Sequence, residues 1–521
     1  MSTHDAYQKI KGLDELAGIL KDLKKQGKTV VQCHGVFDLL HPGHIKHFEA
    51  AAREGDVLIV TLTQDKYVGK GPGRPVFNER LRAESIAELQ CVDYVAINRW
   101  STAVQAIALL HPDVYVKGSD YADREKDLTG EIHKEEAAVK AAGGRIHFTD
   151  EITFSSTELI NMHFSVYHQE ADEFLKSFRG EYSADEIIRK LKALKKTRVL
   201  IVGDAIIDEY HYCAPMGKAW KETVLTTRYL NRESFAGGVL AAANHLAGFC
   251  DDVHLVTCLG QENTQEEFIR GKLKSNIRPK FFYRDDAPTV VKRRYVDPAF
   301  LSKIFEVCFL NDHPLPPEID REVCNHLARC GGEYDLVIAA DFGNGFMGKN
   351  IVEALCATAS FLAVHTQTNS ANTGFNLITK YPKADYICID EPEIRLATHE
   401  KFENLNKLIT AISAALHCGR ISITRGHNGS LGYERGKGFF EVPVFSREIV
   451  DRIGAGDAYL AVTSPCVAMG YPMDMVGFIG NAVGALAVRI VCNREAVEPI
   501  PLFKYIKALL KSERDSPRGH A

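Results

Sequence analysis

The fold of the N-terminal part of the chain is decided by Gly35-Val36-Phe37-Asp38-Leu39-Leu40-His41-Pro42-Gly43-His44. This segment follows the β-rich run Val30–Cys33 and precedes a helical pattern that extends to about Glu54. Backbone N–H groups at a helix N-terminus carry partial positive charge, and Gly43 allows close approach to the main chain. The segment therefore predicts a strand-to-helix turn that binds an anion.

The sequence on both sides of this turn alternates between short β-rich runs and helical patterns. Further runs lie at residues 57–60, 92–95 and 114–116, and an amphipathic helix is predicted over 78–90. This alternation is typical of a parallel α/β sheet. We expect a Rossmann-like domain over residues 1–166.

A second α/β pattern begins at Arg198-Val199-Leu200-Ile201-Val202-Gly203-Asp204. Further strands are predicted at 336–339 and 421–424. The intervening residues are helical in pattern and highly charged. We expect an α/β protein with a helical linker over 167–196 and a second α/β domain over 197–521.

The composition is that of a folded protein with no global attraction for polyanions. The 521 residues are 45% hydrophobic and 25% charged, with a formal net charge of -5, so nucleic-acid binding is not indicated. Residues 1–5 lack the layout of a secretory signal, and polar residues and prolines interrupt the apolar stretch 459–492, which predicts buried helices. We expect a cytoplasmic protein with no membrane anchor. The thirteen scattered cysteines, with no C-x-x-C pair, favour reduced thiols over a zinc site.

Two imidazoles at the first turn suit chemistry on a triphosphate. His41 and His44 are three residues apart, so both face the same side of a helix start and can donate hydrogen bonds to phosphate oxygens. Attack at an α-phosphate needs charge stabilisation more than a protein nucleophile. A histidine pair alone is more often a capping or packing feature.

The whole run resembles the cytidylyltransferase-like nucleotidyltransferase superfamily, which has H-x-G-H after G-x-F-D. The resemblance implies that His41 and His44 are catalytic and contact the triphosphate, and that Lys117 neutralises phosphate charge. Lys70 and Arg74, in a Gly- and Pro-rich loop, are expected to meet the sugar phosphate, although such exposed cations are often merely solvated. At the two positions before Gly35, relatives carry Thr or Ser and then Asn or Tyr, and His34 is the second of these positions here. His34 either alters substrate contacts or packs. The other nucleotide-binding residues implied are Gly35, Phe37, Asp38, Gly43, Ser155, Ser156 and Thr157.

A second glycine-led helix start lies at residues 450–458. Consecutive N–H groups of Gly454, Ala455 and Gly456 can form an anion hole for a γ-phosphoryl group, and Asp457 is placed to accept a proton from a substrate hydroxyl. By itself the pattern is often an ordinary helix start. With Asp457 as the base, it predicts a kinase.

The region from about Thr197 to Lys511 resembles the ribokinase-like, or PfkB, sugar kinases. The resemblance implies that Asp208 accepts a sugar hydroxyl, that Gly237 and Gly238 cover the sugar, and that Mg²⁺-ATP lies near Asp390 and Glu393 without direct metal ligation. The remaining nucleotide-binding residues implied are Thr424 and Gly426.

Several positions depart from the PfkB pattern. Ala241 stands where the family has an asparagine, which leaves Asn244 as the substrate-binding candidate. His365 opens a stretch that replaces D-P-K, and Asp390 replaces an asparagine. These changes leave the sugar open. No G-x-x-x-x-G-K-[ST] motif occurs, so a P-loop is excluded.

The pairing of the two domains resembles the bifunctional heptose kinase and ADP-heptose synthase, in reversed order. The resemblance implies a sugar kinase and a sugar-1-phosphate nucleotidyltransferase that together make an ADP-heptose-like nucleotide sugar, with ATP or CTP as the second nucleotide. A phosphatase acts between the two steps in the resembling pathway. Two alternatives stay open: an enzyme pair making a CDP-polyol, and a nucleotidyltransferase with a catalytically weak, sugar-sensing kinase-like module. Relatives often dimerise through a lid sheet, to which residues 228–230 and 292–295 are candidates.

Overall fold

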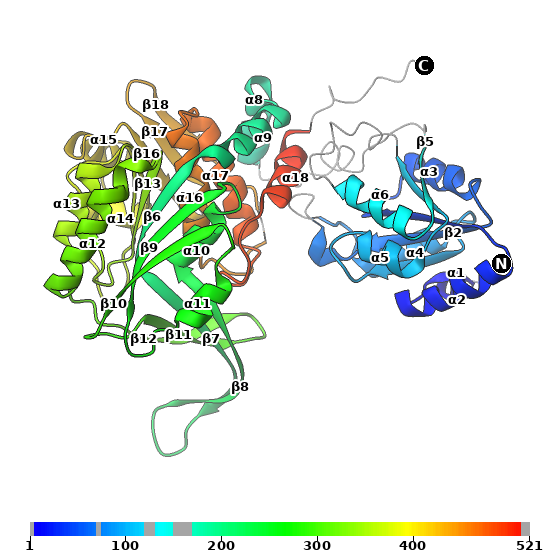
Figure 1. Cartoon of the computed structure of the whole chain (residues 1–521), viewed down its shortest axis with the longest axis horizontal. Coiled ribbons are helices and arrows are strands. Elements are labelled where there is room, and N and C mark those ends of the chain that lie inside the picture. Colours follow the sequence, from blue (N-terminus) through cyan, green and yellow to red (C-terminus); the bar gives the residue numbers. More distant parts are fainter. Residues whose placement is uncertain (1–4, 69–73, 119–130, 150–168, 447, 512–521) are drawn as a thin grey trace. The chain divides into compact units, whose positions relative to one another are not determined.

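The computed structural model describes residues 5–68, 74–118, 131–149, 169–446 and 448–511. The chain divides into two compact units, one of residues 1–168 and 503–521 and the other of residues 169–502 (Figure 1). The helix α18 (Pro499–Leu510) spans this boundary in the sequence. No helix within the described residues is long and apolar enough to cross a bilayer.

The first unit contains a parallel sheet, as the sequence pattern predicts, and the structure shows five strands in the order β3-β2-β1-β4-β5. Strand β3 starts two residues later than expected, and β5 was not foreseen. The strands are β1 (Val30–Gly35), β2 (Val57–Thr63), β3 (Tyr94–Asn98), β4 (Val114–Gly118) and β5 (Arg145–Thr149).

Helices cover both faces of this sheet, because alternate side chains of each strand point to opposite sides. One core joins Val31 and Cys33 to α3 and α4, and the other joins Val30 to α2 and α5. The helices are α1 (Asp5–Lys9), α2 (Leu13–Lys25), α3 (Pro42–Ala52), α4 (Glu79–Ala87), α5 (Val104–Leu110) and α6 (Glu131–Ala141).

The second unit contains a nine-stranded sheet in the order β10-β9-β6-β13-β14-β15-β16-β17-β18. All neighbours pair in parallel except β17 and β18, which form an antiparallel edge. The strands are β6 (Arg198–Gly203), β9 (Asp252–Gly260), β10 (Ile277–Arg284), β13 (Leu336–Asp341), β14 (Leu362–Thr366), β15 (Tyr386–Asp390), β16 (Arg420–Thr424), β17 (Ser430–Glu434) and β18 (Gly438–Val442).

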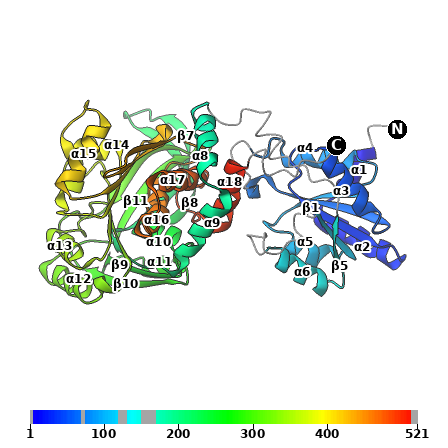
Figure 2. The same cartoon turned by 90° about the horizontal axis from the view of Figure 1, so that it is seen from above.

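Two groups of helices cover this sheet, one on each face (Figure 2). The first group packs on the core that contains Val337 and Val364. It consists of α12 (Pro317–Cys330), α13 (Lys349–Thr358), α14 (Glu391–Thr398) and α15 (Leu405–Ala415). The second group consists of α10 (Val239–Leu246), α16 (Ala455–Ala468) and α17 (Met473–Ala487). The apolar stretch that the sequence assigned to buried helices is therefore α16 and α17.

A separate four-stranded sheet has the order β12-β11-β7-β8. Residues 228–230 lie in β8 and residues 292–295 in β11, as expected of a lid sheet. The strands are β7 (Ala205–Lys218), β8 (Leu225–Gly238), β11 (Val290–Asp297) and β12 (Ser302–Phe309), and α11 (Glu266–Lys272) lies between β9 and β10 in the sequence.

The segment 167–196 contains two helices that pack on the second unit. The rings of Phe178 and Phe478 stack with centroids 4.5 Å apart, and the hydroxyl of Tyr182 donates to Asp474 over 3.0 Å. These helices are α8 (Gln169–Glu181) and α9 (Ala184–Ala193). Short 3₁₀ turns complete the described structure at η1 (Asp65–Tyr67), η4 (Leu194–Lys196), η5 (Gly331–Glu333), η6 (Ile378–Lys380) and η7 (Gly426–Asn428).

Candidate functional site

The first candidate site is the turn between β1 and α3. Strand β1 ends at Gly35, and Phe37 adopts a left-handed backbone with φ 46°. His41 is the extended N-cap residue of α3, which begins at Pro42, a residue well suited to the first helical position. The rings of His41 and His44 stack with centroids 3.8 Å apart, so the two imidazoles lie on the same side of the first turn.

Asp38 and Arg74 form a buried ion pair beside this turn. The Asp38 carboxylate lies 3.3 Å from the Arg74 guanidinium, and both side chains are 1% exposed. Asp38 also accepts hydrogen bonds from the backbone N–H groups of Val76, at 2.6 Å, and Phe77, at 3.3 Å. Arg74 was expected in an exposed loop, where it would meet the sugar phosphate, whereas its side chain is buried against Asp38, which also holds the segment after residue 74 against the turn.

Lys117 lies at the end of β4, next to the first site. Its ammonium group is 2.9 Å from Glu135 on α6. Burial and the charge of Lys117 lower the pKa of His34 to about 3 and that of His47 to about 4. Both imidazoles are therefore neutral at pH 7. Nδ1 of His34 lies 2.9 Å from the Thr61 hydroxyl, so this residue packs within the sheet.

Four residues predicted for the first site lie outside the described residues. They are Lys70, Ser155, Ser156 and Thr157.

The second candidate site lies where the lid sheet meets the carboxyl end of the nine-stranded sheet. Asp208 on β7 pairs with Arg294 on β11. A Cβ at Gly237 would lie 2.0 Å from Oδ2 of Asp208, so only glycine permits this approach of β8. The neighbouring Gly238 has φ 57° and ψ -133°, a conformation available essentially to glycine alone.

Asp457 is the buried carboxyl group of this site. It lies in the first turn of α16 and is 9% exposed. Burial and the charge of Asp208 raise its pKa to about 6, while His365 and Lys292 act in the opposite direction. The folded chain thus brings Asp457 within electrostatic range of Asp208, although the two residues lie far apart along the sequence.

Gly454 sets the geometry of the turn before α16. It is the N-cap residue and has φ 86°, a left-handed conformation that favours glycine. A Cβ at this position would lie 2.0 Å from Oδ1 of Asn493. The first N–H groups of a helix have no partner within the helix, and that of Ala455 makes only a long hydrogen bond, of 3.4 Å, to the Arg452 carbonyl. The amides of residues 454–456 therefore suit an anion.

Asp451 connects this turn to the lid sheet, a role that the sequence analysis missed. Its fully buried carboxylate accepts hydrogen bonds from the Tyr210 hydroxyl, at 2.7 Å, and the Lys303 ammonium, at 2.6 Å. The backbone N–H groups of Ile453 and Cys492 also donate to it. No local pattern marks Asp451, because its side-chain partners Tyr210 and Lys303 lie 241 and 148 positions away in the sequence.

Asp390 and Glu393 form a capping box at the start of α14. Asp390 accepts from the Glu393 N–H, and the Glu393 carboxylate accepts from the Asp390 N–H, both at 2.8 Å. Burial and the charge of Asp390 raise the pKa of Glu393. Asp390 pairs with Thr424 across the sheet, and Gly426 follows with φ 56°. Among the described residues, no group of three or more His, Cys, Asp or Glu side chains is arranged to hold a metal.

Asn244 on α10 contacts the backbone of Lys272 and Lys274. Its amide donates to the carbonyl of Lys272 at 3.1 Å and accepts from the N–H of Lys274 at 3.0 Å. Both of its functional groups therefore hold the segment after α11. Ala241 is buried and apolar.

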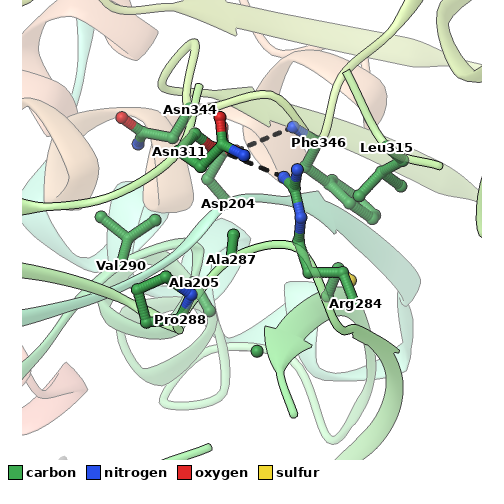
Figure 3. Close-up of a pocket in the computed structure, with 12 residues that line it drawn as sticks. Asp204, Ala205, Arg284, Ala287, Pro288, Val290, Asn311, Leu315, Asn344 and Phe346 are labelled. Atoms are coloured by element: carbon green, nitrogen blue, oxygen red, sulfur yellow. Dashed lines mark hydrogen bonds between the residues drawn. The ribbon is translucent and has the colours of Figure 1, made fainter. Parts of the chain in front are cut away.

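A small polar cavity of about 20 Å³ borders the second site. Figure 3 shows Asp204, Arg284 and Asn344 around it, from three separate segments. Burial and the charge of Asp341 raise the pKa of Asp204 to about 6. Ala205 also lines the cavity and pairs with Gly238 of the second site. A cavity of this size has room for about one water molecule.

The fold and site of the second unit define a ribokinase-like α/β protein, with a lid sheet that carries one carboxylate and a glycine-led helix that carries another. The family model "pfkB family carbohydrate kinase" matches residues 196–491, more than half of the chain. The chain therefore belongs to the pfkB family of carbohydrate kinases. The model "Cytidylyltransferase-like" matches residues 33–162, so the two matches occur in the order transferase, then kinase.

Curated relatives share part of the chain. "Bifunctional protein HldE" of Geobacter metallireducens is 40% identical over 172 residues, which are 32% of this chain and 33% of that protein. "Bifunctional protein HldE" of Gluconobacter oxydans is 40% identical over 147 residues, 28% of this chain and 29% of that protein. The chain thus spans about a third of the length of these relatives. A crystal structure of phosphofructokinase-2 from Escherichia coli with potassium aligns with a TM-score of 0.49 and 13% identity, over 60% of this chain and 100% of that one.

Proposed function

We propose that the chain is a bifunctional enzyme: a kinase for a heptose-phosphate-like sugar and a nucleotidyltransferase that makes a nucleotide sugar of the ADP-heptose type. The observation that carries the proposal is the presence of two phosphate-suited helix starts in one chain. One has the buried carboxyl Asp457 beside it, and the other has the stacked imidazoles of His41 and His44. The bifunctional relatives named above support the pairing.

In the kinase reaction, Asp457 takes the proton of a sugar hydroxyl. The hydroxyl oxygen forms a bond to the γ-phosphorus of ATP, the bond to the β-phosphate oxygen breaks, and ADP leaves. The N–H groups of Gly454, Ala455 and Gly456 stabilise the charge on the phosphoryl oxygens. Asp208, oriented by Arg294, accepts a second sugar hydroxyl. Gly237 and Gly238 close the sugar site from β8.

In the nucleotidyltransferase reaction, an oxygen of the sugar 1-phosphate attacks the α-phosphorus of a nucleoside triphosphate and pyrophosphate leaves. His41 and His44 donate hydrogen bonds to the phosphate oxygens, and Gly43 lets the phosphate approach the backbone. Lys117 balances the charge next to this turn. Asp38 and Arg74 hold the turn in place, and ATP is the favoured nucleotide, with CTP as the competing choice.

Mg²⁺ would lie near Asp390 and Glu393. The raised pKa values of both carboxyl groups, caused first by burial, mean that their charged forms lack full compensation in the protein alone. Mg²⁺ usually keeps several water ligands and binds substrate phosphates, so these carboxyl groups would hold it through water and not by direct ligation. The residues therefore fit the ion, which would neutralise charge on the ATP phosphates. Thr424 and Gly426 line the neighbouring nucleotide position.

We propose a homodimer formed through the lid sheet. Tyr229 and Leu230 on β8 and Phe305 and Phe309 on β12 expose large apolar surfaces. Such side chains on one sheet favour burial against a second copy. We further propose that residues 1–166 and 197–521 are the two functional domains, joined by 167–196.

The experiment that tests the proposal combines two assays on the full chain. Heptose and other sugar phosphates are screened with Mg²⁺-ATP for phosphorylation, and sugar 1-phosphates are screened with ATP and CTP for pyrophosphate release. We expect turnover in both, with an ADP-sugar identified by product mass. A CDP-polyol product would replace the sugar assignment, and no turnover with any substrate would refute the proposal.

A further inference from the structure

A buried imidazole occupies the carboxyl end of β14. His365 is 7% exposed, and its Nδ1 lies 2.7 Å from the carbonyl oxygen of Cys388 on β15. A carbonyl oxygen only accepts hydrogen bonds, so Nδ1 is the donor in this contact and carries a proton. Nε2 is fully buried and has no hydrogen-bond partner among the described residues. Buried polar atoms are normally satisfied, which points to a partner that binds there.

The position of His365 identifies that partner. It lies at the same end of the sheet as Asp390, which ends the neighbouring strand β15. Its imidazole lowers the pKa of both Asp390 and Asp457, while burial raises both pKa values by more. The imidazole is therefore within electrostatic range of both carboxyl groups. The ring of Phe342 contacts it edge-on, with centroids 5.8 Å apart, and covers one side.

We propose that Nε2 of His365 binds the phosphoryl group that passes from the nucleotide to the sugar, by donating a hydrogen bond to one of its non-bridging oxygens. The inference rests on the proposed kinase function. In this contact the ring is an imidazolium, which donates from both nitrogens: Nδ1 to the Cys388 carbonyl and Nε2 to the phosphoryl oxygen. No covalent bond to the imidazole forms. His365 thus supplies the cationic donor at this end of the site.

Two substitutions separate this role from a structural one. The side-chain amide of Asn reaches about as far as Nδ1, so His365→Asn keeps the donor to Cys388 and removes the group at Nε2. The longer amide of Gln reaches about as far as Nε2, so His365→Gln keeps a donor toward the phosphoryl group and loses the contact with Cys388. We expect His365→Asn to lower kcat of sugar phosphorylation on the order of a hundredfold with little change in the sugar KM. We expect His365→Gln to retain at least about a tenth of the wild-type kcat.

Nucleotide binding provides a readout that needs no sugar. In a His41→Ala/His44→Ala background, which weakens the first site, the Kd of a non-hydrolysable ATP analogue and the Kd of ADP are measured by calorimetry. We expect His365→Asn to weaken binding of the analogue about tenfold and to leave ADP binding unchanged, because only the analogue has a γ-phosphoryl group. If wild-type turnover is absent but this difference is present, the proposed sugar kinase function fails and the His365 contact stands.

The opposite pattern would overturn the inference. Wild-type kcat in His365→Asn, together with lower kcat and a lower melting temperature in His365→Gln, would make the imidazole a structural link between β14 and β15. Equal loss of affinity for ADP and the ATP analogue would also overturn it. Pyrophosphate release by chains with an intact first site serves as the internal control, and neither His365 variant is expected to change it.

Discussion

Asp457 combines burial with nearby negative charge, and under the proposed mechanism its pKa sets the pH range of sugar phosphorylation. Its pKa of about 6 means that the carboxyl is increasingly protonated as the pH falls below 6. A protonated carboxyl cannot accept the hydroxyl proton, so kcat/KM should fall about tenfold per pH unit on that side. Lys292 lowers this pKa, so Lys292→Met should move the acidic limb to higher pH. If the acidic limb of the pH profile does not move in this variant, the assignment of Asp457 as the base is contradicted.

The same carboxyl should reduce the stability of the second unit. A pKa raised from 3.8 to about 6 means that folding favours the protonated form. Its contribution to stability is therefore full below pH 4 and is lost as the pH rises through 6, by at most roughly 3 kcal/mol. Asp457→Asn should abolish sugar phosphorylation yet raise the melting temperature more at pH 8 than at pH 4.5. Calorimetric scans at both pH values test this, and a lower melting temperature at pH 8 would argue against it.

Gly237 allows β8 to approach the Asp208 carboxylate. Gly237→Ala would bring a Cβ within 2.0 Å of Oδ2, which forces the carboxylate to move. We expect the KM for the sugar to rise at least about tenfold, while pyrophosphate release is unchanged. Gly484→Ala on α17 is the matched control, since a Cβ there meets nothing within 4 Å. Comparable kinetic losses in both variants would show that the contact with Asp208 is not the cause.

At the scale of elements, Asp451 links the lid sheet to the turn before α16. Lys303→Met on β12 removes the ammonium that lies 2.6 Å from its carboxylate and leaves a buried charge less compensated. We expect kcat/KM of sugar phosphorylation to fall about tenfold, because the anion-binding turn loses a fixed support. Lys221→Met, at an exposed position between β7 and β8, is the control. Steady-state kinetics of the two variants should differ clearly, and equal values would contradict the link.

Sequence pattern alone predicted the elements better than their contacts. Apolar β-branched runs identified β1, β2, β4 and β6, since burial on both faces requires such residues. Strand β5 (Arg145–Thr149) was missed because only its last residue is fully buried. The burial of Arg74 was missed for a different reason: its partner Asp38 lies 36 positions earlier, and no local pattern encodes that pairing.

The residues of the candidate sites, too, could be predicted only where a local sequence pattern marks them. Glycine and acidic positions such as Gly454 and Asp457 were identifiable because a helix start imposes a local pattern on them. Arg294 and Asp451 were not identifiable, since Arg294 lies 86 positions from Asp208 and Asp451 lies 241 positions from Tyr210. Such contacts are set by the way in which β11 and α16 meet β7, which only the folded structure reveals.

At the scale of the whole molecule, the two activities should be separable. A chain with Asp457→Asn retains the first site, and a chain with His41→Ala and His44→Ala retains the second. With a phosphatase added for the intermediate step, a mixture of the two chains should convert the sugar phosphate to the nucleotide sugar, because released intermediates diffuse between them. Neither chain should do so alone. If both partial activities are intact but the mixture is inactive, intermediates pass within one chain.

The backbone at Gly454 limits how the kinase can change by mutation. Every single-nucleotide change in a glycine codon that alters the residue either introduces a Cβ or stops translation. At this position a Cβ would meet Asn493 and would demand a left-handed backbone from a residue that disfavours it. At Gly180 and Gly271, in contrast, an added Cβ meets nothing within 4 Å, so alanine fits there without a clash. At position 454 a side chain stays disfavoured even if Asn493 changes, because the left-handed backbone remains.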